Sequence, residues 1–196
     1  MAELLRKNLA QFVDLTEDEF AHVLSYTEEI HLAKQGHLLR QGEVCRYAFF
    51  FLEGCARYYY LREGEEQVGQ FFFEGGWVSD LYSFLTELPS GMNIAAIEPC
   101  RVLAISKENL NRIYDEVPKM DRFGRKLMEN TLVQVQKRSN AFLTQSPTEK
   151  YLEILQTRPK VVSRVPQYLI ASYLGIKPES LSRIRKRMAE EGKETS

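Results

Sequence analysis

One stretch near the carboxyl end constrains the fold more than any other, residues 165–188, VPQYLIASYLGIKPESLSRIRKRM. Apolar residues at helical spacing lead up to Gly175, a residue type that ends helices in the left-handed conformation. Pro178 then suits the first turn of a second helix, because its missing N–H would be unpaired there anyway. Small Ala171 allows the two helices to pack closely. Two short helices joined by such a turn form a helix-turn-helix.

The second helix of this motif has a polar and mostly basic outer face. Leu181, Ile184 and Met188 repeat at positions i, i+3 and i+7, which predicts one buried stripe. Residues 177–188 hold five Lys or Arg and one Glu. A helix of this kind fits the DNA major groove. We therefore predict DNA binding; the alternative interpretation is an ordinary helical hairpin with a solvated basic face.

The carboxyl-terminal part of the chain and the remainder differ in charge. The 196 residues have a net charge of −1, but residues 146–196 hold 10 Lys or Arg against 6 Asp or Glu. The remainder is acidic, with 16 basic and 21 acidic side chains. A basic carboxyl-terminal part on an acidic body is typical of a DNA-binding domain attached to a domain with another task.

The sequence pattern changes between residues 28 and 106, where glycines separate short aromatic and aliphatic segments. Such spacing predicts an all-β sandwich or barrel with hairpin turns at Glu53-Gly54 and Glu63-Gly64. The Phe triplets 49–51 and 71–73 are interpreted as core and sheet residues rather than an aromatic binding platform. The predicted strands are residues 30–33, 37–39, 47–52, 56–61, 67–73, 93–97 and 101–105.

Helices are predicted on both sides of this β-rich region. Thr16 and Glu19 form a capping-box pattern at the start of one helix. Further helices are predicted over residues 3–12, 107–114, 119–144 and 147–157. The helix over residues 119–144 would be about 40 Å long at 1.5 Å per residue. Its length indicates a coiled-coil-like dimer helix, and the alternative is a helix that packs only within its own chain.

Together these features resemble the cyclic-AMP receptor protein/FNR (Crp/Fnr) family of bacterial transcription regulators. The resemblance rests on HLLRQGEVCRYAFFFLEGCARYYY, similar to the start of the family's β roll, and on LGIKPESLSRIRKRM, similar to its recognition segment. It implies an α+β fold: an N-terminal β-roll (double-stranded β-helix or jelly-roll-like) effector domain over residues 1–117, a dimerisation helix over 118–145, and a helix-turn-helix domain over 146–196.

The resemblance also assigns roles in DNA recognition. Glu179 and Arg183 would face base edges, with Ser182 beside them; Arg can bond guanine bidentately, and Glu can accept from the amino group of cytosine. Other polar residues suit phosphates, which position the helix without specifying sequence. This second set is Gln167, Ser180, Arg185 and Lys186. The family binds palindromic double-stranded DNA as a homodimer, which makes RNA polymerase a further candidate partner.

The sensory site departs from the family pattern. Members that bind cyclic AMP carry a Gly-Glu pair for the ribose and, about ten residues on, an Arg-Ser/Thr pair for the phosphate. Here Ser79-Asp80 and Ser90-Gly91 stand at those places. A buried phosphate without a cation is strongly disfavoured, so we expect no cyclic-nucleotide binding. Trp77 and Tyr82, with Phe84, either line an apolar pocket for another effector or fill the empty one.

A second departure concerns the wing, a β-hairpin that follows the recognition helix in this family. Eight residues, AEEGKETS, follow Met188 here. They are interpreted as a frayed tail, so the wing is expected to be reduced or absent. Fewer phosphate contacts would then make the salt dependence of DNA binding shallower.

The sequence indicates neither a cofactor nor an enzyme. Cys45, Cys55 and Cys100 are widely spaced and are expected to be reduced structural thiols, with no metal-ligand pattern. The iron–sulfur branch of the family needs an N-terminal cysteine cluster, whereas a haem ligand among the three histidines stays open. No nucleophile–base arrangement or phosphate-cradling loop occurs.

No signal peptide or membrane helix is predicted, so a cytoplasmic location is expected. The alternative function is a ligand-sensing or protein-interaction module whose DNA binding is degenerate.

Overall fold

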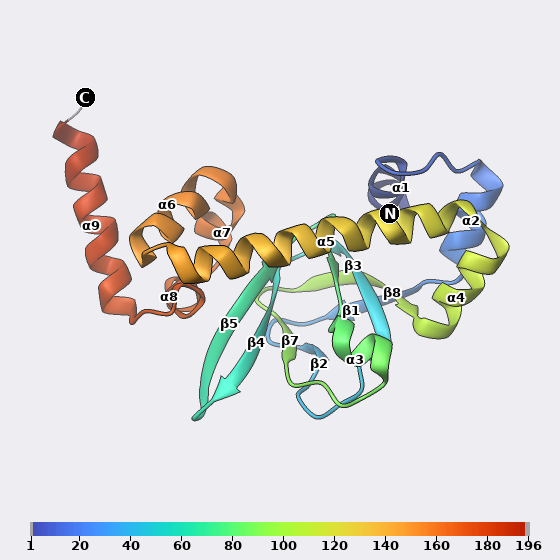
Figure 1. Ribbon diagram of the computed structural model, residues 1–196, viewed down its shortest axis with the longest axis horizontal. Coiled ribbons are helices and arrows are strands. Elements are labelled where there is room, and N and C mark those ends of the chain that lie inside the picture. Colours follow the sequence, from blue (N-terminus) through green and yellow to red (C-terminus); the bar gives the residue numbers. More distant parts are fainter. Residues whose placement is uncertain (1, 195–196) are drawn as a thin grey trace. The chain divides into compact units, whose positions relative to one another are not determined.

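The computed structural model describes the backbone of residues 2–194 and the side chains of residues 3–190. The chain divides into two compact units (Figure 1). The first comprises Met1–Tyr58 and Phe71–Gln136, and the second comprises Tyr59–Gln70 and Lys137–Ser196. The second unit therefore contains both the carboxyl-terminal helices and a short segment from the middle of the β-rich region.

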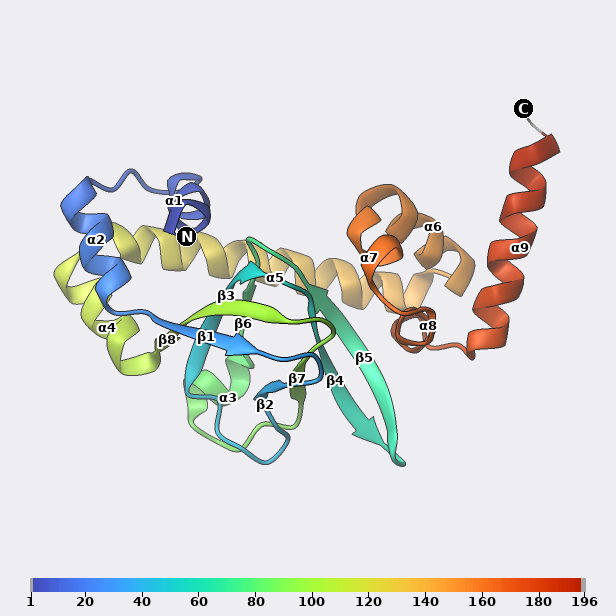
Figure 2. The ribbon, with the colours of Figure 1, turned by 180° about the vertical axis from the view of Figure 1, so that it is seen from behind.

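The strands form two four-stranded sheets, ordered β1-β8-β3-β6 and β2-β7-β4-β5 (Figure 2). Strands distant in sequence pair antiparallel, as in Glu28↔Ala104 of β1 and β8. This is the expected mixed α+β fold, and each predicted strand is within two residues of its observed bounds. The short β6 was not predicted. The bounds are β1 Glu28–Leu32, β2 His37–Leu39, β3 Tyr47–Glu53, β4 Ala56–Arg62, β5 Glu65–Phe72, β6 Trp77–Val78, β7 Asn93–Ala96 and β8 Cys100–Ser106.

The core of the first unit has two parts on opposite faces of β3. Side chains alternate across a strand, so Phe49 and Phe51 enter the cluster shared with the second sheet, whereas Phe50 and Leu52 enter a cluster beneath helices. Phe50 and Phe51 are both completely buried. The Phe triplet is therefore a core feature, as the sequence predicts.

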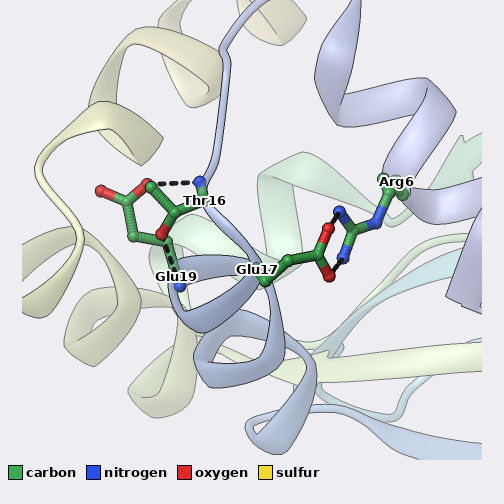
Figure 3. A network of polar contacts seen from close by, with 4 residues as sticks. All are labelled: Arg6, Thr16, Glu17 and Glu19. Carbon is green, nitrogen blue, oxygen red and sulfur yellow. Dashed lines mark hydrogen bonds and ion pairs between the residues drawn. The ribbon is translucent and has the colours of Figure 1, made fainter.

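Helices cover the outer face of β3 and β8, and caps fix where they begin. These helices are α1 Ala2–Ala10, α2 Glu17–Ser25, α4 Lys107–Glu116 and the start of α5 Lys119–Thr144, whereas α3 Leu81–Thr86 packs through Phe84 into the cluster between the sheets. The predicted capping box is present: Thr16 Oγ1 accepts from the Glu19 N–H at 3.2 Å, and Glu19 Oε2 accepts from the Thr16 N–H at 2.8 Å (Figure 3). Arg6 makes a bidentate ion pair with Glu17 beside it, which joins α1 to α2 (Figure 3).

The second unit is built around the end of α5 and four further helices. These are α6 Pro147–Thr157, α7 Pro159–Arg164, α8 Gln167–Leu174 and α9 Pro178–Glu194. Ser146 and Glu149 form a second capping box at the start of α6. The buried side chains include Tyr151, Ile154, Val161, Leu169, Ile170, Leu174 and Leu181. The predicted third helix, α6, and the predicted helix-turn-helix, α8 and α9, thus share one small core.

The carboxyl end differs from the sequence-based expectation of a frayed tail. Helix α9 continues past Met188 to Glu194. Ala, Glu and Lys are good helix formers, and a single Gly192 costs only about 1 kcal/mol relative to Ala. Residues 195 and 196 lie outside the described part of the chain, and the reduced wing remains a prediction.

Candidate DNA interface and effector pocket

The turn of the helix-turn-helix has the geometry that its sequence requires. Gly175 ends α8 in the left-handed conformation with φ of 70°. The N–H of Gly175 donates to the carbonyl of Ser172, and the N–H of Ile176 donates to that of Ala171, both at 3.0 Å. These bonds close a Schellman-type cap, which satisfies the last carbonyls of α8. Ala171 is completely buried, which is consistent with close approach of the helices.

Helix α9 turns one polar face to solvent. Glu179, Ser182, Arg183 and Lys186 are exposed, and their spacing of i, i+3, i+4 and i+7 places them on one side of the helix. The opposite side holds the fully buried Leu181. The three residues assigned to base edges therefore share a face, together with Lys186.

Hydrogen bonds already order part of this face. Arg183 Nη2 donates to Ser180 Oγ at 3.1 Å, one turn earlier on the same helix. Arg187 Nη2 donates to Thr148 Oγ1 of α6 at 3.4 Å, which ties α9 to the first turn of that helix. The guanidinium of Arg183 is thus held near the start of α9, the part of a recognition helix that contacts bases.

The residues assigned to phosphates flank this face. Gln167 is exposed at the first position of α8, where backbone N–H groups point toward an approaching anion. Arg185 is exposed, and Ser180 is half-buried. The second unit therefore presents two helix starts and a row of cations on its surface.

A second candidate site lies in the first unit, around the start of α3. Asp80 is buried and caps this helix, with Oδ1 accepting from the N–H groups of Tyr82 at 3.2 Å and Ser83 at 3.4 Å. Its other oxygen accepts from the Ser90 hydroxyl at 2.7 Å. Ser90 Oγ in turn accepts from the N–H of Met92 at 3.0 Å. The structure thus joins two of the predicted pocket residues directly.

Ser83, which sequence analysis did not single out, closes the same segment. Its hydroxyl donates to the carbonyl of Leu88 at 2.5 Å and accepts from the N–H of Cys45 at 2.8 Å. Ser83 is completely buried. Only three-dimensional contact reveals this role, because a lone serine in a helix gives no indication of its partners.

The chain is similar to known proteins both in this segment and in its fold. Residues 29–117 match the family of cyclic nucleotide-binding domains. Among solved structures, the chain is similar to FixK2 from Bradyrhizobium japonicum, with a TM-score of 0.71, 18% identity, and 85% of this chain and 86% of that chain covered. The matched segment lies mostly in the first unit, and its residues 59–70 belong to the second.

Two further structures extend the similarity over most of the chain. The c-di-GMP-responsive global regulator CLP from Xanthomonas campestris has a TM-score of 0.69 at 16% identity, covering 90% of this chain and 93% of that chain. The Thermus thermophilus catabolite activator protein has a TM-score of 0.59 at 18% identity, covering 94% and 88%. The Crp/Fnr fold is thereby confirmed. No curated protein matches the sequence closely enough to count as a relative.

The side chains of the other predicted pocket residues contact different groups or are exposed. Trp77 Nε1 donates to Asn8 Oδ1 at 2.9 Å, and the Trp77 ring packs 5.0 Å from that of Phe50, in the cluster under the helices. Ser79 Oγ donates to the carbonyl of Tyr47 at 3.1 Å. Tyr82 is 62% exposed. Gly91 is also exposed.

Phe84, the third aromatic residue considered for the pocket, is buried in the core between the sheets. The side chain of Phe84 therefore fills the interior between the sheets.

The described residues contain no group of three or more His, Cys, Asp or Glu side chains placed to hold a metal ion. Within the described residues, no helix has the length and apolar character needed to span a bilayer.

Helix α5 has two different apolar faces. Met120, Phe123 and Gly124 are buried against the first unit's own core. Farther along the helix, the large apolar side chains are exposed. Four of them follow one another at intervals of four, three and seven residues. Their exposed fractions are 40% for Met128, 67% for Leu132, 46% for Val135 and 76% for Phe142.

Proposed function

We propose that the chain is a dimeric, sequence-specific DNA-binding transcription regulator whose sensory domain does not bind cyclic AMP. The observation that supports it most is the face of α9 that carries Glu179, Ser182, Arg183 and Lys186, placed on a helix-turn-helix in a chain with the Crp/Fnr fold. The proposal has three parts, which are DNA recognition by α9, dimerisation through α5 and a sensory pocket that does not take cyclic AMP.

The first step concerns base recognition. Arg183 has the fork of N–H donors that matches O6 and N7 of guanine, and Glu179 has the acceptor that suits the amino group of cytosine. Ser180 orients the Arg183 guanidinium in the free protein, so less side-chain freedom is lost on binding. Gln167, Arg185 and Lys186 supply phosphate contacts, which fix the position of α9 in the major groove.

The second step is dimerisation through α5. Met128, Leu132, Val135 and Phe142 occupy a and d positions of a heptad, with Ser139 at the remaining a position. Exposed apolar residues in this register are typical of a coiled-coil seam, because a second helix with the same pattern buries all of them. A second copy of this chain is the occupant that carries the same pattern. A twofold dimer would read a palindrome with half-sites about 10–10.5 base pairs apart.

The third step concerns the pocket. Both oxygens of Asp80 accept hydrogen bonds from within the first unit and the residue is 4% exposed, so a ribose hydroxyl could reach the carboxylate only if this segment rearranged. Ser90, at the place of the family's phosphate-binding Arg, is a neutral side chain bonded to Asp80. The internal hydrogen bonds thus stabilise the segment without a nucleotide.

The DNA-reading role is tested by measuring affinity for a palindromic duplex selected with the wild-type protein. We expect Arg183→Ala to weaken binding by about 5-fold to 150-fold, which corresponds to about 1–3 kcal/mol for a bidentate base contact. The variant should also lose the preference for one base at the same position of each half-site.

A matched control removes the same charge from the first unit. Arg40 is exposed and lies outside α8 and α9, so Arg40→Ala should leave affinity within about 2-fold at moderate salt, where distant exposed charges are screened. Equal affinity of wild type and Arg183→Ala, or wild-type binding without any sequence preference, would show that α9 does not read DNA.

A further inference from the structure

Within the second unit, the outer edge of β5 is covered by α8. β5 is the outermost strand of its sheet, so its outer edge presents backbone N–H and C=O groups that no neighbouring strand satisfies. The hydroxyl of Ser172 on α8 donates to the carbonyl of Glu66 at 2.5 Å and accepts from the N–H of Val68 at 3.0 Å. A single side chain thereby pairs with two edge groups of β5.

A second contact continues along the same strand. Arg158, at the start of α7, donates from Nη1 to Gln70 Oε1 at 2.7 Å. Ser172 is half-buried and Val68 is buried, so these bonds are partly shielded from water. We call the contacts of Ser172 and Arg158 with β5 the clasp. It joins the hairpin to the helices of the DNA-binding half.

The clasp places the hairpin beside the DNA-reading end of α9. A groove of about 660 Å³ is lined on one side by Glu65, Glu66 and Gln67 of β5. Its other walls are α8 and the turn into α9. The residues of those walls are Tyr168, Leu169, Ser172, Gly175, Ile176, Lys177, Pro178 and Glu179. In a helix-turn-helix the first helix crosses the DNA backbone and the start of the second enters the groove, so the hairpin adjoins the helix ends that would approach a duplex.

The hairpin is acidic where it lies next to α8 and the start of α9. The turn and the start of β5 carry three exposed or half-exposed carboxylates, Glu63, Glu65 and Glu66, against one Arg62. Duplex DNA carries one negative charge per about 1.7 Å of its axis. Carboxylates next to the reading surface therefore repel the phosphates that Gln167 and Arg185 would contact.

We propose that the clasp is an autoinhibitory contact: the β4–β5 hairpin, held to α8 by Ser172, lowers DNA affinity until the contact opens. This inference rests on the proposed DNA-binding function. Opening of the clasp frees α8 and the start of α9 and removes the acidic turn from the path of the duplex. A signal that reaches β4 or β5 through the cyclic nucleotide-binding domain would act on DNA binding by this route.

The test uses the whole chain of 196 residues and two readouts. Ser172→Ala removes the hydroxyl that bonds Glu66 and Val68. We expect it to bind the selected duplex about 2-fold to 10-fold more tightly, the factor that corresponds to loss of one or two hydrogen bonds. Amide hydrogen exchange of Val68 should accelerate by a similar factor, because its N–H loses the acceptor.

Two matched variants accompany it. Ser172→Thr retains a hydroxyl and should restore most of the wild-type affinity and exchange rate. Ser163→Ala removes an exposed hydroxyl of α7 that bonds only within its own helix, to Pro159 and Lys160 among the described contacts, and should change neither readout.

A charge variant tests the proposal independently of the hydroxyl. Glu65→Gln combined with Glu66→Gln leaves the Glu66 carbonyl in place, so the clasp should persist while repulsion falls. We expect tighter DNA binding, with the gain shrinking as salt rises because exposed charges are screened.

The outcomes separate the two proposals. Faster exchange at Val68 with unchanged or weaker DNA binding in Ser172→Ala would overturn the autoinhibitory role and leave the DNA-binding function standing. Unchanged exchange at Val68 would show that Ser172 does not hold the hairpin, which also overturns it. If neither wild type nor any variant binds DNA with sequence preference, the proposed function fails and this inference fails with it.

Discussion

At the scale of single residues, Asp80 shows how the sensory domain is held together. Its carboxylate caps α3 through Tyr82 and Ser83 and accepts from Ser90 at a sequence distance of ten residues. An N-cap satisfies backbone N–H groups that have no partner inside the helix. The position assigned by resemblance to a ligand contact is therefore also a structural position.

Asp80→Ala should destabilise the protein by about 1–3 kcal/mol, because it removes an N-cap and one of the two acceptors of the buried Ser90 hydroxyl. Chemical denaturation of the wild type and the variant measures the difference. Asp14 is exposed, so Asp14→Ala is the matched control and should change stability by less than about 0.5 kcal/mol. Equal stability of the two variants would contradict the capping role.

Glu116 provides a pH-dependent contact between α2 and α4. A hydrogen bond from the Tyr26 hydroxyl at 2.7 Å, followed by one from His22, lowers the pKa of Glu116 below its ordinary value of 4.5. A carboxyl group whose pKa is lowered by folding stabilises the fold above its unfolded pKa, and this contribution is lost as pH falls through the folded value.

Glu116→Gln should therefore lower the thermal midpoint near neutral pH, and the difference from wild type should shrink between about pH 5 and pH 3. Thermal unfolding across that range measures it. Glu28 is exposed on β1, so Glu28→Gln serves as the control. A difference that stayed constant down to pH 3 would show that ionisation of Glu116 contributes nothing to stability.

Residues with a local role were predictable from sequence, and residues with a distant partner were not. Thr16, Glu19 and Gly175 act on backbone within a few positions, so spacing alone identifies them. Ser83 and Ser172 bond to groups 38 and 106 positions away. Serine is common and forms many kinds of hydrogen bond, so nothing in its neighbours indicates these partners.

At the scale of elements, α5 combines the two interpretations that its sequence left open. Its first turns pack within the chain through Met120 and Phe123, whereas Leu132 and Val135 are exposed. Gly124 allows the close approach of Tyr114, whose hydroxyl oxygen would lie 2.5 Å from a Cβ at this position. Sequence periodicity showed an apolar stripe but could not divide it, because both faces use the same residue types.

Leu132→Glu should convert the proposed dimer to a monomer, because it places a charge in the centre of the apolar seam. Sedimentation equilibrium or light scattering at several concentrations measures the mass. Asn130 is exposed on the opposite side of α5, so Asn130→Glu should leave the dimer intact. A wild-type monomer at every concentration, or a Leu132→Glu dimer as stable as wild type, would contradict dimerisation through α5.

At the scale of the whole molecule, the sequence predicted the β-rich region, the long helix and the helix-turn-helix in the right order. It did not predict that residues 59–70 of the β region belong to the same compact unit as the carboxyl-terminal helices. Strand patterns identify β4 and β5 but not what contacts their free edge, because backbone groups carry no sequence signal.

Cyclic AMP should not stabilise the intact protein. At about 1 mM, a ligand with a Kd of about 10 µM would add about 2.7 kcal/mol to the free energy of unfolding. We expect no change in the thermal midpoint, because Asp80 and Ser90 are hydrogen-bonded to each other and Ser90 supplies no positive charge for the phosphate. A concentration-dependent rise in the midpoint would overturn this part of the account.

The most direct test of the central claim is selection of binding sites from a pool of random DNA duplexes by the wild-type chain. We expect enrichment of an inverted repeat whose half-sites lie about one helical turn apart. Arg183→Ala should lose one symmetric base preference in each half-site while the spacing is kept. Failure to enrich any sequence, or enrichment of an unrepeated site that Arg183→Ala selects equally well, would contradict it.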